Sequence, residues 1–370
     1  MSRPVQLTDL DVLPLPTGRL ELRRAWPSTP DHVLLEYVGP TGQPVAGQWI
    51  RDSDQRRRVL AGTPQPAFVV PDTGVLLQPA GADRKLRGLA PLLAEPGACL
   101  LSHRAERRAV VRRADGCYVK VVRPGRSDAV ARAAAVAAAA LAGHVDVPTL
   151  LAHDAVRGTL VWTALPGSTL HDWASTSTTS TPTAGGAGSW REAGRAIAHL
   201  HVADTDGLAT RGVEDERRAA TRWLAPARAL GLLPDGPDVP ELPAGQGLAA
   251  DVVLHGDLHD KQLVADCTTA VSRIGLLDVD QLARGEAAID VANLLVHLEL
   301  RVAQLLMTPA AGVMARDAFL DGLAPDDVTL ARVAVLSELV RMRLAGLYAF
   351  RPRWRALAQQ LYATTVLATG

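Results

Sequence analysis

Residues 252–281 read VVLHGDLHDKQLVADCTTAVSRIGLLDVDQ, and this stretch is the most informative part of the chain. An apolar run leads into the tripeptide HGD at 255–257, Gln262 follows, and a second apolar run ends in Asp278 and Asp280. Short apolar runs bounded by polar residues predict buried strands. The polar side chains would then lie in loops at the strand ends, where binding and catalytic groups are often placed.

The residue types in this stretch fit phosphoryl transfer. That reaction needs a carboxylate beside the attacking hydroxyl and oxygen ligands that hold Mg²⁺ against the phosphates. Mg²⁺ accepts one or two carboxylates together with other oxygen ligands and waters. Asp257 is the candidate base, and Gln262 and Asp278 are candidate metal ligands. Asp280 is either a further ligand or a group that supports them. An HGD tripeptide alone is common, so the prediction depends on the complete spacing.

The spacing resembles a known catalytic loop. Protein kinases carry H-R-D, an Asn shortly after it, and D-F-G after the next strand. This chain carries H-G-D, four residues and Q, followed by D-V-D and later by IDVANLL at 289–295. That form resembles the aminoglycoside phosphotransferase and choline kinase-like family. A Gln at position 262, in place of the usual Asn, resembles the pattern of the maltokinase-like subgroup.

The resemblance implies a fold, cofactors and a partner. The fold would be α/β and protein kinase-like, with a small β-rich N-lobe and a mainly helical C-lobe. The cofactors would be ATP, or another nucleoside triphosphate, and Mg²⁺. The partner would be a small molecule that offers a hydroxyl group. Sugars and aminoglycosides are the leading acceptor classes, and the Gln slightly favours a sugar.

The resemblance also implies roles within the catalytic segment. Asp257 would be the catalytic base, His255 would brace its loop, and Asp290 would help to hold the segment in place. Gln262, Asp278 and Asp280 would supply the metal ligands. His259 and Asp260 are expected to be loop residues that face solvent.

Residues 98–124 predict three strands of the N-lobe, followed by an Ala-rich helix at 128–142. Lys120, in CYVKVVRPG, resembles the lysine that contacts the nucleotide phosphates in kinases. Leu165, in ALPGSTL at 164–170, resembles the hinge whose backbone would bind adenine. An ordinary turn is the alternative for this last segment.

The loop at 102–111, SHRAERRAVV, departs from the kinase pattern because it contains no glycine. Kinases use a Gly-rich loop over the nucleotide phosphates. Arg104, Arg107 and Arg108 would supply the positive charge from their side chains instead.

The helix at 128–142 departs as well, because Ala133 stands near the place of the glutamate that pairs with the lysine in kinases. Lys120 is therefore expected to be poorly ordered without nucleotide, or to pair with Asp278 across the cleft. These departures leave a second hypothesis open, a catalytically weak, pseudokinase-like nucleotide-binding module. A protein kinase is disfavoured because no long activation loop follows Asp278.

Three regions are expected along the chain. Residues 1–95 would form a β-rich N-terminal extension, 96–166 the kinase-like N-lobe and 167–370 the helical C-lobe with the catalytic loop. Residues 174–188 are low in complexity and predict a mobile loop. Apolar residues at three- and four-residue spacing predict helices of the C-lobe, at 190–201, 214–231, 287–307, 326–348 and 352–366.

Composition bounds the partners and the location. Lys plus Arg and Asp plus Glu number 39 each, so no overall charge points to nucleic acid or to a membrane surface. Residues 1–200 nevertheless carry a net charge of +6 (23 − 17) and residues 201–370 a net charge of −6 (16 − 22). A basic half that faces an acidic half suits an anionic cosubstrate and metal ions. The longest apolar stretch is too short to cross a bilayer, so the cytoplasm is the expected location.

Overall fold

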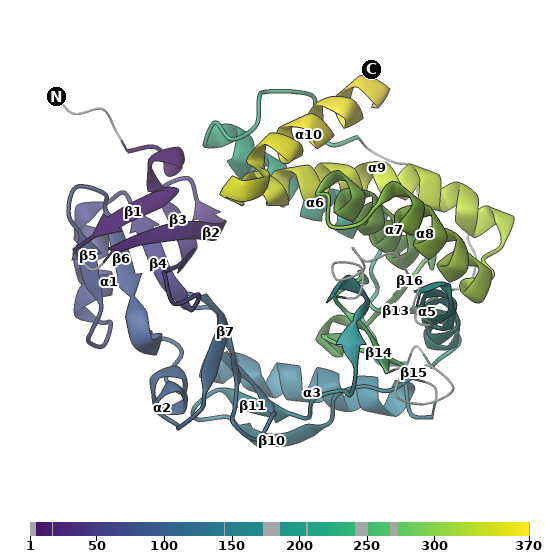
Figure 1. Cartoon of the computed structure of the whole chain (residues 1–370), viewed down its shortest axis with the longest axis horizontal. Coiled ribbons are helices and arrows are strands. Elements are labelled where there is room, and N and C mark those ends of the chain that lie inside the picture. Colours follow the sequence, from purple (N-terminus) through teal and green to yellow (C-terminus); the bar gives the residue numbers. More distant parts are fainter. Residues whose placement is uncertain are drawn as a thin grey trace.

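The structure is a computed structural model that describes residues 5–16, 18–143, 145–172, 186–204, 206–240, 251–266 and 273–369. The predicted loop at 174–188 lies outside these residues up to 185, and its end forms the start of helix α5 (Gly186–His201). Figure 1 shows an N-terminal sheet, a second sheet and a helical part that follow one another in a ring.

The N-terminal sheet has six antiparallel strands in the order β1-β2-β3-β4-β6-β5. The strands are β1 (Val12–Leu15), β2 (Gly18–Thr29), β3 (His32–Val38), β4 (Pro44–Ile50), β5 (Phe68–Val70) and β6 (Val75–Gln78). All side chains in the middle of β3 are buried, because both faces of the sheet are covered at this point. A helix that the sequence did not predict, α1 (Ser53–Ala61), follows β4.

The second sheet has five antiparallel strands in the order β10-β11-β9-β8-β7. The strands are β7 (Cys99–Arg104), β8 (Arg108–Arg112), β9 (Tyr118–Val122), β10 (Leu150–Asp154) and β11 (Thr159–Trp162). The three strands predicted in 98–124 are thereby confirmed. Helix α3 (Pro124–Ala140) begins before the predicted 128, because a proline suits the first turn of a helix. The short helix α2 (Leu89–Leu93) joins the two sheets.

The helical part contains long helices that pack in pairs, α5 on α8 and α6 on α9. The helices after α5 are α6 (Val213–Ala229), α7 (Ala288–Ala303), α8 (Pro309–Leu323), α9 (Asp327–Ala349) and α10 (Arg355–Thr369). The predicted helices are confirmed to within a few residues. The sequence did not predict α8, although the Thr308 side chain caps its first turn and a proline follows. No helix among the described residues could span a membrane.

Short strand pairs carry the catalytic segment. Strand β13 (Val252–Leu254) pairs with β16 (Ala283–Gly285), and β14 (Leu263–Asp266) pairs with β15 (Arg273–Leu276) and with β12 (Ser168–Thr169). The HGD loop connects β13 to β14, and the D-V-D motif follows β15. The two loops are therefore neighbours at one end of these strands.

Candidate active site

A cleft of about 490 Å³ lies between the second sheet and the helical part. Its lining brings together six of the residues singled out in the sequence, namely Arg108, Lys120, Leu165, Gln262, Asp278 and Asp280. They come from β8, β9, the segment after β11, the loop before β14 and the loop after β15. Residues that are distant in the chain thus face one cavity.

Lys120 closes this cleft through two ion pairs. Its ammonium lies 3.0 Å from an Asp278 oxygen and 2.5 Å from an Asp280 oxygen. Burial would lower the pKa of Lys120, but the Asp278 and Asp280 carboxylates raise it overall. Burial would raise the pKa of Asp278, but Lys120 and then Arg108 hold it below its usual range. Of the two alternatives expected for Lys120, disorder or a pair with Asp278 across the cleft, the structure has the pair with Asp278.

The candidate metal ligands are held close together by the backbone. Leu277 donates its N–H to the carbonyl oxygen of Gln262 at 2.9 Å, which joins the HGD loop to the loop of Asp278. Asp278 has φ 58° and ψ 37°, a left-handed conformation that is uncommon for a residue other than glycine. Two carboxylates and one amide oxygen form a hard oxygen donor set, which suits Mg²⁺.

Hydrogen bonds with buried groups hold the HGD loop in place. His255 is fully buried, and its Nε2 lies 2.8 Å from the carbonyl oxygen of Leu277. The Asp290 carboxylate accepts the N–H of His255 at 2.6 Å and the N–H of Gly256 at 3.0 Å. Gly256 has φ 81°, and a Cβ there would come within 2.6 Å of the Gln281 carbonyl oxygen. The loop therefore requires glycine at this position.

Asp257 is half-buried beside the cleft and is not among the residues that line it. Arg211, which the sequence did not single out, lies behind it: it donates hydrogen bonds to the Gly256 carbonyl and to Glu216. Burial would lower the pKa of Arg211, but Glu216, then Asp290 and Asp257, raise it. Arg211 thus adds a positive charge that interacts with Asp257.

Polar side chains along one face of α7 contact successive residues of the catalytic loop. Asp290 holds the loop start, and Asn293 donates to the Leu258 carbonyl at 2.8 Å. The ring of His297 packs against the ring of His259, with centroids 4.7 Å apart and planes tilted by 46°. Polar residues at positions 290, 293, 297 and 301 lie on one face of a helix. This periodicity is present in the sequence and is the signal that could reveal this polar stripe.

Arg301 ends the stripe and corrects an expectation. Its guanidinium donates to both carboxylate oxygens of Asp260, at 2.8 and 3.0 Å. His171 lies 2.6 Å from the same carboxylate. The expectation that Asp260 faces solvent is wrong, because its side chain is completely buried and is in contact with Arg301 and His171. His259 is also mostly buried, and burial first of all lowers its pKa to about 4.

The β7–β8 hairpin takes the position of a Gly-rich loop but is docked on the N-terminal sheet. The N–H of His103 donates to buried Glu36 at 2.8 Å, and the His103 ring lies 3.0 Å from Asp83. Glu106, at the turn, pairs with Arg84 at 2.5 Å. The extra sheet therefore holds this hairpin in place.

The three hairpin arginines occupy different places. Arg108 lines the cleft, whereas Arg107 is exposed outside it. Arg104 stacks on Trp26 of the N-terminal sheet, with its guanidinium carbon 5.2 Å from the ring centroid. Only Arg108 of these three lines the cleft.

The other end of the cleft is apolar and suits a flat ring. Leu165 lines it next to Trp162, Val264 and Leu277. The chain passes β14 so closely that a Cβ at Gly167 would lie 2.1 Å from the Ala265 carbonyl oxygen. The predicted hinge segment is thus packed directly against the catalytic segment.

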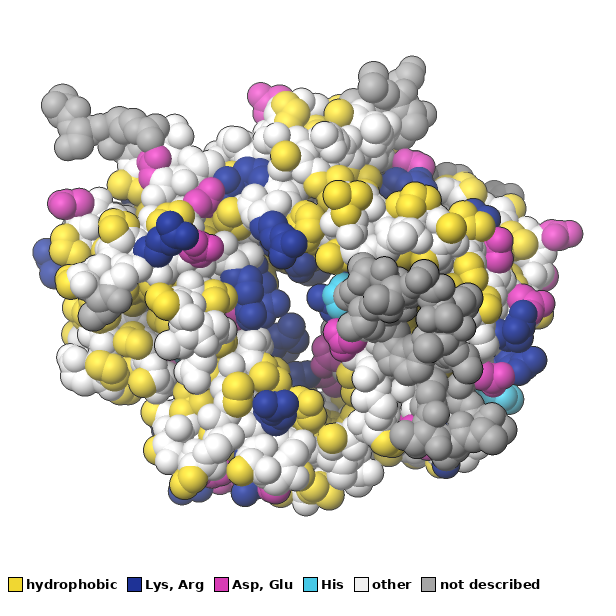
Figure 2. Space-filling view, viewed as in Figure 1, with side chains coloured by type: hydrophobic (Ala, Val, Ile, Leu, Met, Phe, Trp, Pro, Cys, Tyr) yellow, Lys and Arg dark blue, Asp and Glu magenta, His cyan; other side chains and the backbone are white. Residues whose placement is uncertain are grey.

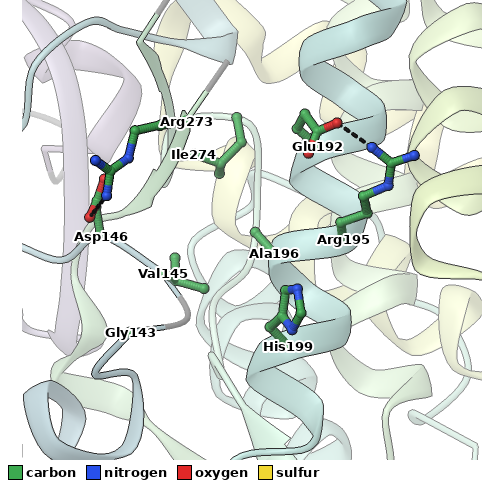
Figure 3. A pocket seen from close by; sticks show the side chains of 9 residues that line it. All are labelled: Gly143, Val145, Asp146, Glu192, Arg195, Ala196, His199, Arg273 and Ile274. Carbon is green, nitrogen blue, oxygen red and sulfur yellow. Dashed lines mark hydrogen bonds and ion pairs between the residues drawn. The ribbon is translucent and has the colours of Figure 1, made fainter. Parts of the chain in front are cut away.

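A second pocket lies between α5, β15 and the segment that precedes β10 (Figure 3). Its charged side chains pair with one another, Arg273 with Asp146 at 2.9 Å and Arg195 with Glu192. None of the residues singled out in the sequence lines it. The cleft with Lys120 is therefore the candidate active site. Among the described residues, no three His, Cys, Asp or Glu side chains form a separate metal site.

Comparison with known proteins bears on the same region. A sequence model described as the phosphotransferase enzyme family matches residues 98–334. No curated protein matches the chain. Among solved structures, the chain is similar to aminoglycoside phosphotransferase APH(3'')-Id from Streptomyces rimosus, with 21% identity, 67% of this chain and 94% of that chain covered, and a TM-score of 0.48. The chain is also similar to macrolide 2'-phosphotransferase MphH from Brachybacterium faecium, with 21% identity, 74% of this chain and 93% of that chain covered, and a TM-score of 0.44. A glucosamine kinase is similar with 18% identity, 95% of each chain covered and a TM-score of 0.38.

The family match begins just before β7 and ends within α9, so it contains the second sheet, the catalytic loop and all residues that line the cleft except Arg24. The small sheet and the helical part form the kinase-like α/β fold that the sequence predicts, with the N-terminal sheet added. The maltokinase-like subgroup stays a prediction. Because the match spans residues 98–334 of 370, the chain belongs to the phosphotransferase enzyme family, and the expected enzyme class, a small-molecule phosphotransferase, is confirmed with it.

Proposed function

We propose that this protein uses ATP and Mg²⁺ to phosphorylate a hydroxyl group of a small molecule. The observation that carries the proposal is the cluster of Lys120, Asp278 and Asp280 in a cleft beside the HGD loop. A lysine that faces two carboxylates and an amide offers charge for phosphates on one wall and oxygen ligands for a cation on the other. The cytoplasm, which holds ATP, is the proposed location.

The chain's own groups would divide the work as follows. Asp257 would accept the proton of the acceptor hydroxyl while that oxygen bonds to the γ-phosphorus and the bond to the nucleoside diphosphate breaks. His255 and Asp290 would position this loop and would not touch substrate. Gln262, Asp278 and Asp280 would hold Mg²⁺, which would offset the charge of the phosphates when bound.

The nucleotide would lie along the second sheet. Lys120 would move from its two carboxylates to the phosphates, and Arg108 would add charge from the hairpin. The backbone around Leu165 would contact the base against the apolar end of the cleft. Arg104 and Arg107, which do not line the cleft, would make weaker contacts to the phosphates. The proposed domains are residues 1–95, 96–166 and 167–370.

Magnesium-dependent ATP consumption with a panel of sugars, aminoglycosides and amino alcohols tests the proposal. Mass spectrometry should detect one added phosphoryl group on an acceptor hydroxyl. Nucleotide binding without any turnover would instead favour the pseudokinase-like module. Failure to bind nucleotide would remove both hypotheses.

A further inference from the structure

The N-terminal sheet reaches the candidate active site with one arginine. Arg24, on β2, lines the cleft together with Arg108 and Lys120. Among the described residues that line the cleft, it is the only one outside the segment 98–334 that matches the family. Figure 2 shows a hollow at the middle of the molecule, with Lys and Arg side chains gathered on one side of it and acidic side chains opposite. The added sheet therefore contributes a positive charge to a cleft that the family segment otherwise builds.

A buried carboxylate holds Arg24 in place. Glu36, on β3, is fully buried and accepts hydrogen bonds from the Arg24 Nε at 2.7 Å and from its Nη2 at 3.2 Å. The same carboxylate accepts the backbone N–H of His103 at 2.8 Å. Because His103 lies in β7, one buried group sets the position of Arg24 relative to the β7–β8 hairpin.

The helical part holds the strand of Arg24 as well. The next residue, Ala25, donates its N–H to the Phe350 carbonyl at 2.8 Å. Nearby in the same two parts of the chain, Arg355 donates two hydrogen bonds to Asp11, at 2.7 and 3.0 Å. The guanidinium is thus positioned by contacts with the hairpin and with the helical part, so it would need little rearrangement when an anion binds.

Glu36 leaves part of the Arg24 guanidinium unused. A guanidinium has five N–H donors, and Glu36 accepts from two of them. No further hydrogen bond of Arg24 is formed in the described part of the chain, although its guanidinium carbon lies 4.9 Å from the Trp26 ring centroid. Glu36 also binds Arg23, so a single negative charge is shared by two guanidinium groups. Donors and positive charge both remain for a ligand in the cleft.

The order of the strands places Arg24 beyond the cations that would hold the phosphates. The second sheet runs from β11, which precedes the hinge segment at Leu165, through Lys120 on β9 and Arg108 on β8 to β7. Adjacent strands are about 4.8 Å apart, so β11 and β7 are separated by roughly 14 Å. Arg24 is joined to β7 through Glu36. A nucleotide with its base at Leu165 would therefore extend its phosphates toward Arg24.

We propose that Arg24 binds the terminal phosphate of the nucleotide, so that the N-terminal sheet supplies a residue of the active site. The inference rests on the proposed function and deepens it. Arginine binds phosphate through charge-assisted hydrogen bonds, which are often bidentate. The hairpin at 102–111 contains no glycine whose backbone could approach the phosphates closely. An arginine from a separate sheet supplies donors at that end of the cleft instead.

Calorimetric titration of the full chain with the Mg²⁺ complexes of ADP and of a non-hydrolysable ATP analogue tests the inference. Arg24→Ala should weaken binding of the ATP analogue by at least about tenfold, as expected for the loss of charge-assisted hydrogen bonds. Binding of ADP should change by less than about twofold, because ADP lacks the phosphate concerned. Arg24→Lys keeps the charge without the bidentate fork, so its affinity for the ATP analogue should be intermediate.

Arg23→Ala is the matched control. Arg23 is the preceding residue and binds the same Glu36 carboxylate at 2.7 Å, but it does not line the cleft. This variant should keep the wild-type preference for the ATP analogue over ADP. A loss in Arg24→Ala that is equal for the two nucleotides, or that Arg23→Ala reproduces, would show a purely structural role and overturn the inference. If urea unfolding shows that Arg24→Ala does not fold, the same comparison in Arg24→Lys decides.

Failure of the inference can be told apart from failure of the proposed function. A wild type that consumes MgATP, with unchanged affinity for the ATP analogue in Arg24→Ala, would overturn the inference alone. An Arg24→Ala variant that raises only the KM of the acceptor would assign the residue to the acceptor and would also overturn it. A wild type that binds neither nucleotide would contradict the proposed function and the inference together.

Discussion

The ammonium of Lys120 lies 3.0 Å from the carboxylate of Asp278, so a strand of the second sheet and the loop after β15 are joined by charge across the cleft. Asp280 adds a second carboxylate to the same ammonium. Helix α3 offers no carboxylate to Lys120 in this structure; its Asp128 lies by His153 instead. In the proposed function, nucleotide and metal would have to displace this ion pair, and nucleotide affinity should therefore be modest.

The lysine leads to the first prediction. Lys120→Ala should weaken MgATP binding by at least about tenfold and leave the protein folded, because one charge-assisted contact is lost. Arg108→Ala should weaken binding more than Arg107→Ala, since only Arg108 lines the cleft. Calorimetry at two salt concentrations checks both, and affinity should fall with salt because exposed arginine charge is screened within about 10 Å at 0.1 M. Undiminished affinity in the Lys120 and Arg108 variants would place the nucleotide elsewhere.

The metal ligands give the second prediction. Asp278→Ala should abolish the magnesium dependence of nucleotide binding, because it removes a carboxylate that Mg²⁺ prefers. Gln262→Asn should be milder than Gln262→Ala, since it keeps the amide oxygen. The measurement is ATP affinity with and without Mg²⁺ for the three variants. Equal effects of the two Gln262 changes would remove this residue from the ligand set.

The sequence predicted the parts of the site that are close in the chain. The HGD loop and the D-V-D loop are connected by two short strands, so local spacing was enough to bring Gln262 and Asp278 together. Lys120 was recognised because a strand and a helix of typical pattern surround it. Its pairing with Asp278 followed from a simple deficit of acidic residues in α3.

The parts that were missed depend on contacts between distant segments. Asp260 looks like a solvent-exposed loop residue until Arg301, from the end of α7, is packed against it. Arg24 could not be placed at the cleft, because nothing local reveals that the N-terminal sheet docks on Phe350. Burial of a polar side chain is a property of tertiary packing, and the sequence pattern of a loop does not contain it.

Removal of Arg301 tests the support of the catalytic loop. Arg301→Gln should lower the free energy of unfolding by about 3–5 kcal/mol, because it leaves the buried Asp260 carboxylate without its bidentate partner. The control is Arg341→Gln, which breaks the more exposed pair with Glu299 and should cost less than about 1 kcal/mol. Urea unfolding of both variants decides the matter, and a similar cost for the two would contradict the buried role of Asp260.

The two histidines in contact, His259 and His297, predict how stability depends on pH. Burial first of all lowers the pKa of His259 to about 4, and it lowers the pKa of His297 well below the usual value. At a pH below about 6.5 but above these lowered pKa values, the two histidines bind protons in the unfolded chain and not in the folded chain. Stability should therefore be complete above pH 6.5 and should fall as the pH drops toward 4.

The pH dependence can be assigned with one variant. His297→Gln cannot bind the proton, so the fall in unfolding free energy between about pH 6.5 and 4.5 should become shallower by up to about 1.4 kcal/mol per pH unit. Urea unfolding at several pH values measures the slope. A slope that is identical to that of wild type would show that His297 does not contribute.

Asp257→Asn is the variant that tests the account most directly. The change keeps the size of the side chain but removes the group that would accept the hydroxyl proton. We expect turnover with the best acceptor to fall at least about a hundredfold, the usual scale for loss of a general base. MgATP affinity should be retained, and Asp321→Asn, at an exposed position of α8, should behave as wild type. Near-normal turnover of Asp257→Asn would contradict the assignment of the HGD loop as the catalytic loop.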